Sequence, residues 1–276
     1  MSTPILEARQ LSVAIGDKLF CRDLGLALHA GERLAILGRN GAGKSTLLSV
    51  LAGLRAAHSG EVLIDGASYA ALGARGSALI RGWLPQVRGD AFASTVLETV
   101  LVGRHPHLER WGWESEQDAG IVRQALAAVD LASFEARDIQ TLSAGERQRL
   151  AIATLLAQQP RLLLLDEPIA HLDLKHQIAM LELFADAARE RGAALAMVLH
   201  EPALAWRFCD RALLIHGDGR SECGPVREML TAERLSALYQ YPLQAIESEG
   251  RISFIPRSRQ VCYPRRPVTG RVTDRD

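Results

Sequence analysis

The chain has 276 residues, of which 32 are basic and 32 acidic, so its formal net charge is zero. This balance argues against long-range attraction to nucleic acid or anionic lipid. The N-terminus shows no secretory signal, and no apolar run reaches the roughly 18 residues that a membrane-spanning helix needs. We therefore expect one α/β domain with a helical insertion, which reaches any membrane only through a partner.

The N-terminal half alternates strand and helix signals. Short β-rich pieces separated by turns fill residues 5–37 and predict an antiparallel lobe that leads into a strand over 33–37. A helix is predicted after Lys44 and ends near Gly53, and residues 60–66 are typical of a strand bounded by turns.

Residues 92–138 have helical spacing, interrupted by an irregular patch from Gly103 to Trp113. A further helix is expected from Ala144 to Gln159, where Pro160 ends it. Together these stretches predict a helical subdomain inserted at about residues 92–158.

The C-terminal half repeats the β–α theme. Leu162–Leu165 is apolar without alternation, as expected of a central parallel strand that is covered on both faces. A helix over 174–191 and a strand over 193–199, which ends at His200, follow. From about Arg251 to residue 276 the chain carries seven arginines and three prolines. We expect this stretch to be a loosely ordered basic tail.

Four cysteines, Cys21, Cys209, Cys223 and Cys262, are scattered without the spacing of a metal site. We interpret them as reduced thiols without a functional role.

Residues 38–46 match the phosphate-binding loop pattern in full, between a predicted strand and a predicted helix. Backbone N–H groups of the glycines and the positive helix N-terminus suit phosphate oxygens. Lys44 is expected at the β- and γ-phosphates, and the Ser45 hydroxyl at Mg²⁺. The residues expected to bind the nucleotide here are Gly38, Asn40, Gly41, Gly43, Lys44, Ser45 and Thr46.

Asp166 and Glu167 end the buried strand, at the edge of the sheet where ligands bind in open α/β folds. An acidic strand-to-loop turn without function is the alternative. After a phosphate-binding loop, we expect Asp166 to hold Mg²⁺ and Glu167 to act as general base on the attacking water.

Ser143-Ala-Gly-Glu146 has the spacing of a capping box for the helix that follows. Such a helix start also offers free N–H groups and a positive dipole to a γ-phosphate. Capping alone explains Ser143 and Glu146, but neither Leu142 nor Gly145.

The heptapeptide Leu142–Gln148 resembles the signature of ABC-type ATPases. Further pieces follow in that family's order, since Gln86 resembles the Q-loop glutamine, Asp173 the D-loop aspartate and His200 the switch histidine. The resemblance implies a P-loop NTPase with an ABC-type RecA-like core, an antiparallel β lobe and a helical subdomain, in one domain over residues 1–250.

The same resemblance implies an ATPase that uses ATP and Mg²⁺. Catalysis is expected from Glu167, His200 and Gln86, and Mg²⁺ binding from Ser45, Gln86 and Asp166. Two copies are expected to pair head to tail, so that Ser143, Gly145 and Asp173 contact the ATP held by the other copy. ATP would close this dimer and hydrolysis would reopen it.

Several stretches, including Val102–His107 and His171–Gln177, resemble importers of iron-siderophores, haem and cobalamin, with cobalamin-type members the most similar. This branch implies a membrane permease dimer as partner, a periplasmic substrate-binding protein acting indirectly, no nucleic acid, and a peripheral place on the cytoplasmic face of the inner membrane. We interpret His105 and His107 as parts of a surface loop near the permease, with a metal site as the alternative.

The chain departs from the family pattern at several positions. Ile15 stands where an adenine-stacking Tyr is usual, and Ala144 replaces a Gly of the signature. Ile169-Ala170 and Glu201 also differ, although none of these changes removes a catalytic group. Three alternatives stay open: an ATPase of another importer class, a soluble ABC ATPase acting on DNA or ribosomes, and a regulatory module without turnover. The single motif set disfavours the second, and the intact catalytic residues disfavour the third.

Overall fold

The computed structural model describes residues 3–86, 93–109, 113–248 and 250–257. Its centre is a six-stranded sheet of order β10-β9-β3-β8-β7-β6, parallel except for β10 at one edge. The strands of this sheet are β3 (Arg33–Gly38), β6 (Arg81–Leu84), β7 (Leu162–Asp166), β8 (Ala194–Val198), β9 (Arg211–Ile215) and β10 (Ser221–Pro225).

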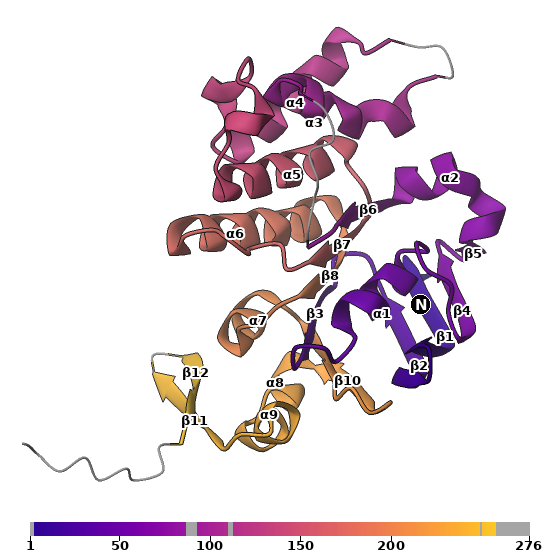
Figure 1. Ribbon diagram of the computed structural model, residues 1–276, viewed down its shortest axis with the longest axis vertical. Coiled ribbons are helices and arrows are strands. Elements are labelled where there is room, and N and C mark those ends of the chain that lie inside the picture. Colours follow the sequence, from indigo (N-terminus) through magenta and orange to yellow (C-terminus); the bar gives the residue numbers. More distant parts are fainter. Residues whose placement is uncertain (1–2, 87–92, 110–112, 249, 258–276) are drawn as a thin grey trace, which may run out of the picture.

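A four-stranded antiparallel sheet of order β2-β1-β4-β5 forms the predicted N-terminal lobe. Its strands are β1 (Leu6–Ile15), β2 (Lys18–Leu28), β4 (Ser59–Ile64) and β5 (Ala67–Ser68). The helix α1 (Lys44–Leu51) lies between the two sheets (Figure 1). The mixed α/β architecture with an antiparallel lobe is confirmed.

Two hydrophobic cores lie on opposite faces of the six-stranded sheet, because side chains alternate along each strand. In β3, Leu34 and Ile36 pack with α1 and the antiparallel lobe. Ala35 and Leu37 point the other way and pack with α5 (Ala144–Gln158), α6 (Leu174–Arg191) and α7 (Pro202–Phe208). The apolar strands of the sheet are therefore buried on both faces, as the sequence predicts for β7.

The helical region lies at the opposite end of the molecule from the C-terminal strands (Figure 1). Its elements are α3 (Val96–Leu101), η1 (Val102–His107), α4 (Glu116–Ala128), η2 (Ala132–Phe134), η3 (Ile139–Thr141) and α5. Capping boxes begin α3, α4 and α5, at Thr95, Ser115 and Ser143. Each satisfies backbone N–H groups that the first helical turn leaves free.

Two regions differ from the sequence prediction. The helix α2 (Tyr69–Ile80) was not anticipated, because Gly73 and Gly76 obscure its helical pattern and Gly73 adopts φ 67°. The tail expected to be loosely ordered from Arg251 is instead a strand over its first six residues. β12 (Arg251–Pro256) pairs antiparallel with β11 (Leu243–Ser248), and Phe254 packs against the main core. Residues 258–276 lie outside the described residues.

Two short helices, α8 (Val226–Met229) and α9 (Ala232–Tyr239), connect β10 to this hairpin. None of the helices in the part of the chain that the structure describes combines the length and the apolar character that a membrane span requires.

Candidate active site

The phosphate-binding loop joins β3 to α1 at the carboxyl end of the parallel strands. Its glycines are required by the geometry: Gly41 and Gly43 adopt φ 75° and 94°, where a Cβ is strained. A Cβ on Gly38 would also lie 2.4 Å from the carbonyl oxygen of Ile215. The loop therefore brings its backbone closer to its surroundings than any other residue type allows.

Lys44 is 6% exposed, and its ammonium group donates to the carbonyl oxygens of Gly38 at 2.9 Å and Arg39 at 3.0 Å. Burial lowers the pKa of Lys44, while the nearby carboxylates of Glu167 and Asp166 partly offset this effect. A buried ammonium group held by carbonyls can exchange these partners for phosphate oxygens, which carry full negative charge.

Asp166 ends β7 and is 3% exposed. Its Oδ1 accepts a hydrogen bond from Ser45 Oγ at 3.0 Å, which brings together two predicted Mg²⁺ ligands that are far apart in sequence. Burial raises the pKa of Asp166, and the Glu167 charge raises it further, whereas the Ser45 hydrogen bond lowers it. A divalent cation at this place would compensate a carboxylate that the protein solvates poorly.

Glu167 follows directly and is paired with His200, the residue predicted to be the switch histidine. His200 Nε2 lies 2.7 Å from Glu167 Oε1. Glu167 also adopts φ 52°, in the left-handed region that non-glycine residues seldom occupy. Backbone strain of this kind concentrates at functional sites, where it fixes the direction of a side chain. The carboxylate of Glu167 is thus held beside both Lys44 and His200.

A pocket of about 290 Å³ lies over the loop. Gln86 and Glu167 line it together with most of the predicted loop residues. Its lining consists of Phe20, Asn40, Gly41, Gly43, Lys44, Ser45, Thr46, Gln86 and Glu167. The structure therefore gathers Gln86, which is distant in sequence, at the predicted nucleotide site.

Phe20 was not anticipated from the sequence. A Cβ on Gly43 would lie 2.4 Å from Phe20 Cγ, and Lys18 Nζ lies 5.0 Å from the centre of the ring. The sequence offered no local signal for this ring, because the alternation of buried residues along β2 is broken at Phe20 and Cys21, which are both buried. Ile15, at the usual adenine-stacking position, is 45% exposed.

The signature and D-loop residues form a separate group. Ser143 begins α5 with the predicted capping box, since its backbone N–H donates to Glu146 Oε2 at 2.6 Å. A Cβ on Gly145 would lie 3.1 Å from the carbonyl oxygen of His171. Asp173 caps α6 and accepts from the backbone N–H of His176 at 2.9 Å. None of Ser143, Gly145 and Asp173 is among the described residues that line the pocket over the phosphate-binding loop.

The expected surface loop around His105 is only partly a loop. Gly103 and Arg104 of η1 are buried, and His107 Nε2 lies 2.8 Å from the carbonyl oxygen of Gln158. His105 is exposed. Within residues 3–86, 93–109, 113–248 and 250–257, no cluster of three or more His, Cys, Asp or Glu side chains could hold a metal ion.

A phosphate-binding loop beside a buried aspartate and a strained Glu–His pair, at the carboxyl edge of a parallel sheet, defines a P-loop nucleoside triphosphatase. Residues 21–170, more than half of the chain, match the family model described as "ABC transporter". The chain belongs to the ABC transporter family and is an ATP-binding ATPase.

Two similar proteins are described as import ATP-binding proteins. The chain is 37% identical over 262 residues to the hemin import ATP-binding protein HmuV of Burkholderia ambifaria, an alignment that covers 88% of this chain and 96% of the relative. It is also 37% identical over 235 residues to the cobalamin import ATP-binding protein BtuD of Halobacterium salinarum, covering 85% of this chain and 58% of the relative.

Solved structures show the same fold. A putative metal-chelate type ABC transporter in an inward-facing conformation matches with a TM-score of 0.80 and 29% identity, covering 93% of this chain and 99% of that one. The dimeric ATP-binding cassette MJ0796, in a post-hydrolysis state with ADP and Pi, matches with a TM-score of 0.68 and 26% identity. That alignment covers 79% of this chain and 97% of the other.

Proposed function

We propose that this chain energises an importer of haem, cobalamin or a ferric siderophore, by closing a head-to-tail dimer around ATP at the cytoplasmic face of the inner membrane. The observation that carries the proposal is the separation of two half-sites. One half contains Lys44 and Glu167, which line the pocket over the phosphate-binding loop, together with their neighbours Asp166 and His200. The other half is Ser143 with its neighbours, which lies outside that pocket.

A second copy would supply the missing half. The N-terminus of α5 presents Ser143 and the N–H groups near Gly145 on the exposed side of the chain. Hydrogen bonds from such groups to a charged γ-phosphate contribute about 1.5–3 kcal/mol each, so several can hold two copies together. Loss of the γ-phosphate removes them, and the dimer opens. The likeness to a dimeric ATP-binding cassette with ADP and Pi supports this arrangement.

Within each site Glu167 acts as the general base for hydrolysis. Its carboxylate accepts a proton from the attacking water as the water oxygen bonds to the γ-phosphorus, and the bond to the β-phosphate oxygen breaks to give ADP and phosphate. His200, whose Nε2 lies 2.7 Å from Glu167 Oε1, orients this carboxylate. Lys44 stabilises the negative charge on the phosphates.

Mg²⁺ fits the oxygen set of this site. Ser45, Asp166 and Gln86 would hold it, and the buried Asp166 carboxylate provides the charge that a hard divalent cation favours. When bound, Mg²⁺ neutralises charge that develops on the β- and γ-phosphates.

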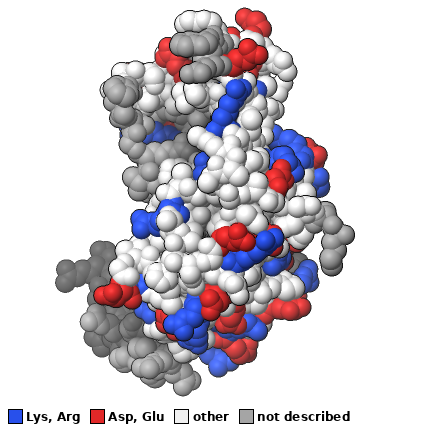
Figure 2. Space-filling view, turned by 90° about the vertical axis from the view of Figure 1, so that its right-hand side faces the viewer, with Lys and Arg blue, Asp and Glu red and all other residues white. Residues whose placement is uncertain are grey.

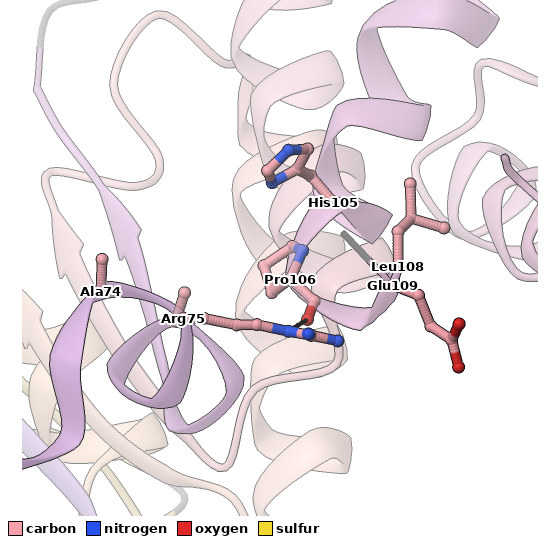
Figure 3. Close-up of a pocket in the computed structure, with 7 residues that line it drawn as sticks. Ala74, Arg75, His105, Pro106, Leu108 and Glu109 are labelled. Atoms are coloured by element: carbon pink, nitrogen blue, oxygen red, sulfur yellow. Dashed lines mark hydrogen bonds between the residues drawn. The ribbon is translucent and has the colours of Figure 1, made fainter. Parts of the chain in front are cut away.

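The permease would dock between α2 and η1. A hollow of about 650 Å³ lies there, lined by Ala74, Arg75, Ala78, His105, Pro106, Leu108 and Glu109 (Figure 3). The same two elements expose Leu79 and Val102, the latter 66% accessible. Exposed apolar side chains beside a hollow are typical of a protein–protein contact. We propose an apolar cytoplasmic segment of the permease as the occupant, because similar proteins are described as an import ATP-binding protein and as an ABC transporter.

No nucleic-acid partner is proposed. The net charge is zero, and in Figure 2 basic and acidic side chains are intermingled on the face that is shown. The solute itself is selected by the permease and a periplasmic binding protein. Uptake of labelled haem, cobalamin and a ferric siderophore by cells with and without this chain identifies it, and loss of none of the three would contradict the importer proposal.

The dimer is tested with Glu167→Gln, which keeps the shape of the side chain and removes the base. Size-exclusion chromatography with light scattering should show an ATP-dependent dimer of this variant that hydrolyses no ATP. Glu201→Gln is the matched control, because this exposed carboxylate lies next to His200 and should leave turnover intact. A folded Glu167→Gln variant that stays monomeric at saturating ATP would refute the shared-site mechanism.

A further inference from the structure

The segment η1 has two sides with different roles. One side, with His105, Pro106 and the following Leu108, walls the hollow between η1 and α2. Arg75 of α2 reaches across and donates to the carbonyl oxygen of Pro106 at 3.0 Å (Figure 3). The other side carries Gly103 and Arg104, which are buried against the C-terminal end of α5.

Gly103 brings the η1 backbone into direct contact with α5. A Cβ at this position would lie 2.3 Å from the carbonyl oxygen of Thr154 and 3.3 Å from Ala157 Cβ. No side chain fits between the two elements, so η1 cannot move toward α5 without pushing it.

Arg104 fastens the same contact. It is 6% exposed, and its Nη1 donates to the carbonyl oxygen of Ala157 at 2.8 Å and to Gln159 Oε1 at 3.1 Å. Its Nε donates to Asp118 Oδ1 of α4 at 2.8 Å. A planar guanidinium group presents its donors from three nitrogens in one fixed geometry, whereas an ammonium group offers three donors on a single rotatable nitrogen.

The helix α5 connects this contact to the signature. It has 15 residues, about 22 Å at the rise of an α-helix. Ser143 caps its N-terminus, and the carbonyls that Arg104 and His107 contact lie in its last turn. A displacement of η1 is therefore passed along a stiff element to the group that would contact the ATP of the second copy.

We infer that Arg104 is the positioning residue through which an occupant of the hollow acts on Ser143. The inference rests on the proposed function, since it assigns the hollow to the permease and Ser143 to the partner's ATP. A parallel link exists, because Gln158 Nε2 donates to the carbonyl oxygen of Ala78 in α2 at 2.6 Å. The test must therefore separate the two links.

A double-mutant cycle on the full-length chain does so. Ala74→Trp places a large side chain in the hollow as a covalent occupant, and steady-state kcat and KM for ATP are measured with and without Arg104→Lys. Lysine keeps the positive charge beside Asp118 but lacks the fixed planar set of donors of the guanidinium group. We expect Ala74→Trp alone to change kcat by about threefold or more, and to have no effect in the Arg104→Lys background.

Two controls are matched to these changes. Ala71→Trp adds the same bulk to α2 at a position that does not line the hollow, and it should leave kcat unchanged. Arg123→Lys alters an exposed arginine that is paired with Glu135 at 3.6 Å, and it should preserve the full effect of Ala74→Trp. If Arg104→Lys does not fold, His107→Gln removes the neighbouring tie to Gln158 and should reduce the Ala74→Trp effect in part.

Two results would overturn the inference. An Ala74→Trp effect of the same size with and without Arg104→Lys would assign the transmission to Gln158. An unchanged kcat in Ala74→Trp would show that filling the hollow does not reach the signature. Either result leaves the proposed function standing if Glu167→Gln still forms its ATP-dependent dimer, whereas a monomeric Glu167→Gln variant would count against the proposed function itself.

Discussion

Replacing Asp118 by asparagine tests whether the ionised carboxylate of Asp118, held by Ser115 and Arg104, stabilises the fold. The side chains of Arg104 and Asp118 are 8% and 11% exposed, and their Nε and Oδ1 atoms lie 2.8 Å apart. The Ser115 hydroxyl and backbone N–H, followed by Arg104, lower the pKa of Asp118 from 3.8 to about 2. The Asp118→Asn variant would leave the guanidinium group buried beside a neutral side chain.

The size of the effect follows from this pKa. One pKa unit corresponds to about 1.4 kcal/mol, so the ionised carboxylate contributes about 2 kcal/mol to the free energy of unfolding at neutral pH. Because the pKa is lower in the folded protein, this contribution is complete above the unfolded pKa of 3.8 and is lost as the pH falls toward 2. About half of it should remain at pH 3.

Urea unfolding followed by circular dichroism measures the free energy of unfolding at pH 7 and at pH 3, and thermal unfolding measures Tm. At pH 7 the Asp118→Asn variant should be less stable by about 2 kcal/mol, which lowers Tm by about 4–8 °C in a chain of this size. The difference should narrow by pH 3. Asp130→Asn is the matched control, since this carboxylate is 82% exposed and lies 3.8 Å from Arg149, and such pairs contribute about 0–1 kcal/mol. A change below about 0.5 kcal/mol in Asp118→Asn, or one independent of pH between 7 and 3, would refute the reasoning.

Two further outcomes are expected at the nucleotide site. Burial raises the pKa of Asp166, so the ionised group destabilises the ligand-free fold above its ordinary pKa. Asp166→Asn should therefore raise Tm at pH 7 while abolishing Mg²⁺-dependent hydrolysis, and a lower Tm would contradict this. Ile15 offers no aromatic face to adenine, so we expect kcat/KM for ATP to exceed that for GTP by less than about a hundredfold. The Ile15→Tyr variant should increase this preference. A preference of more than a hundredfold in the unaltered protein would show that base recognition lies elsewhere.

Local sequence patterns predicted much of the architecture. The helix predicted over 174–191 is observed as α6 with the same bounds, because Asp173 caps its start and Gly192 adopts φ 65° at its end. The capping box at Ser143 and the apolar strand before Asp166 are likewise confirmed. In each case a few neighbouring residues satisfy backbone groups or set a hydrophobic pattern without help from distant parts of the chain.

Contacts between residues far apart in the sequence account for the differences between the predicted and the observed structure. The strand β12 is held by pairing with β11 and by the packing of Phe254 on the core. Composition predicted a loose tail, because it cannot register a partner strand that comes earlier in the chain. The sequence did not indicate that Arg104 is buried either, because its partners, the Asp118 carboxylate and the Ala157 carbonyl, lie 14 and 53 residues away.

The sequence by itself therefore determined the kind of protein and indicated the residues expected to bind the nucleotide, because the phosphate-binding loop and the signature are short motifs whose chemistry depends on adjacent residues. Only the tertiary structure decided how these residues meet. It sets Ser45 against Asp166 and His200 against Glu167, across 121 and 33 positions of sequence. It also keeps Ser143 outside the pocket of its own chain and ties α5 to η1 through Arg104. These distances depend on the sheet order and on the packing of helices, which no local pattern specifies.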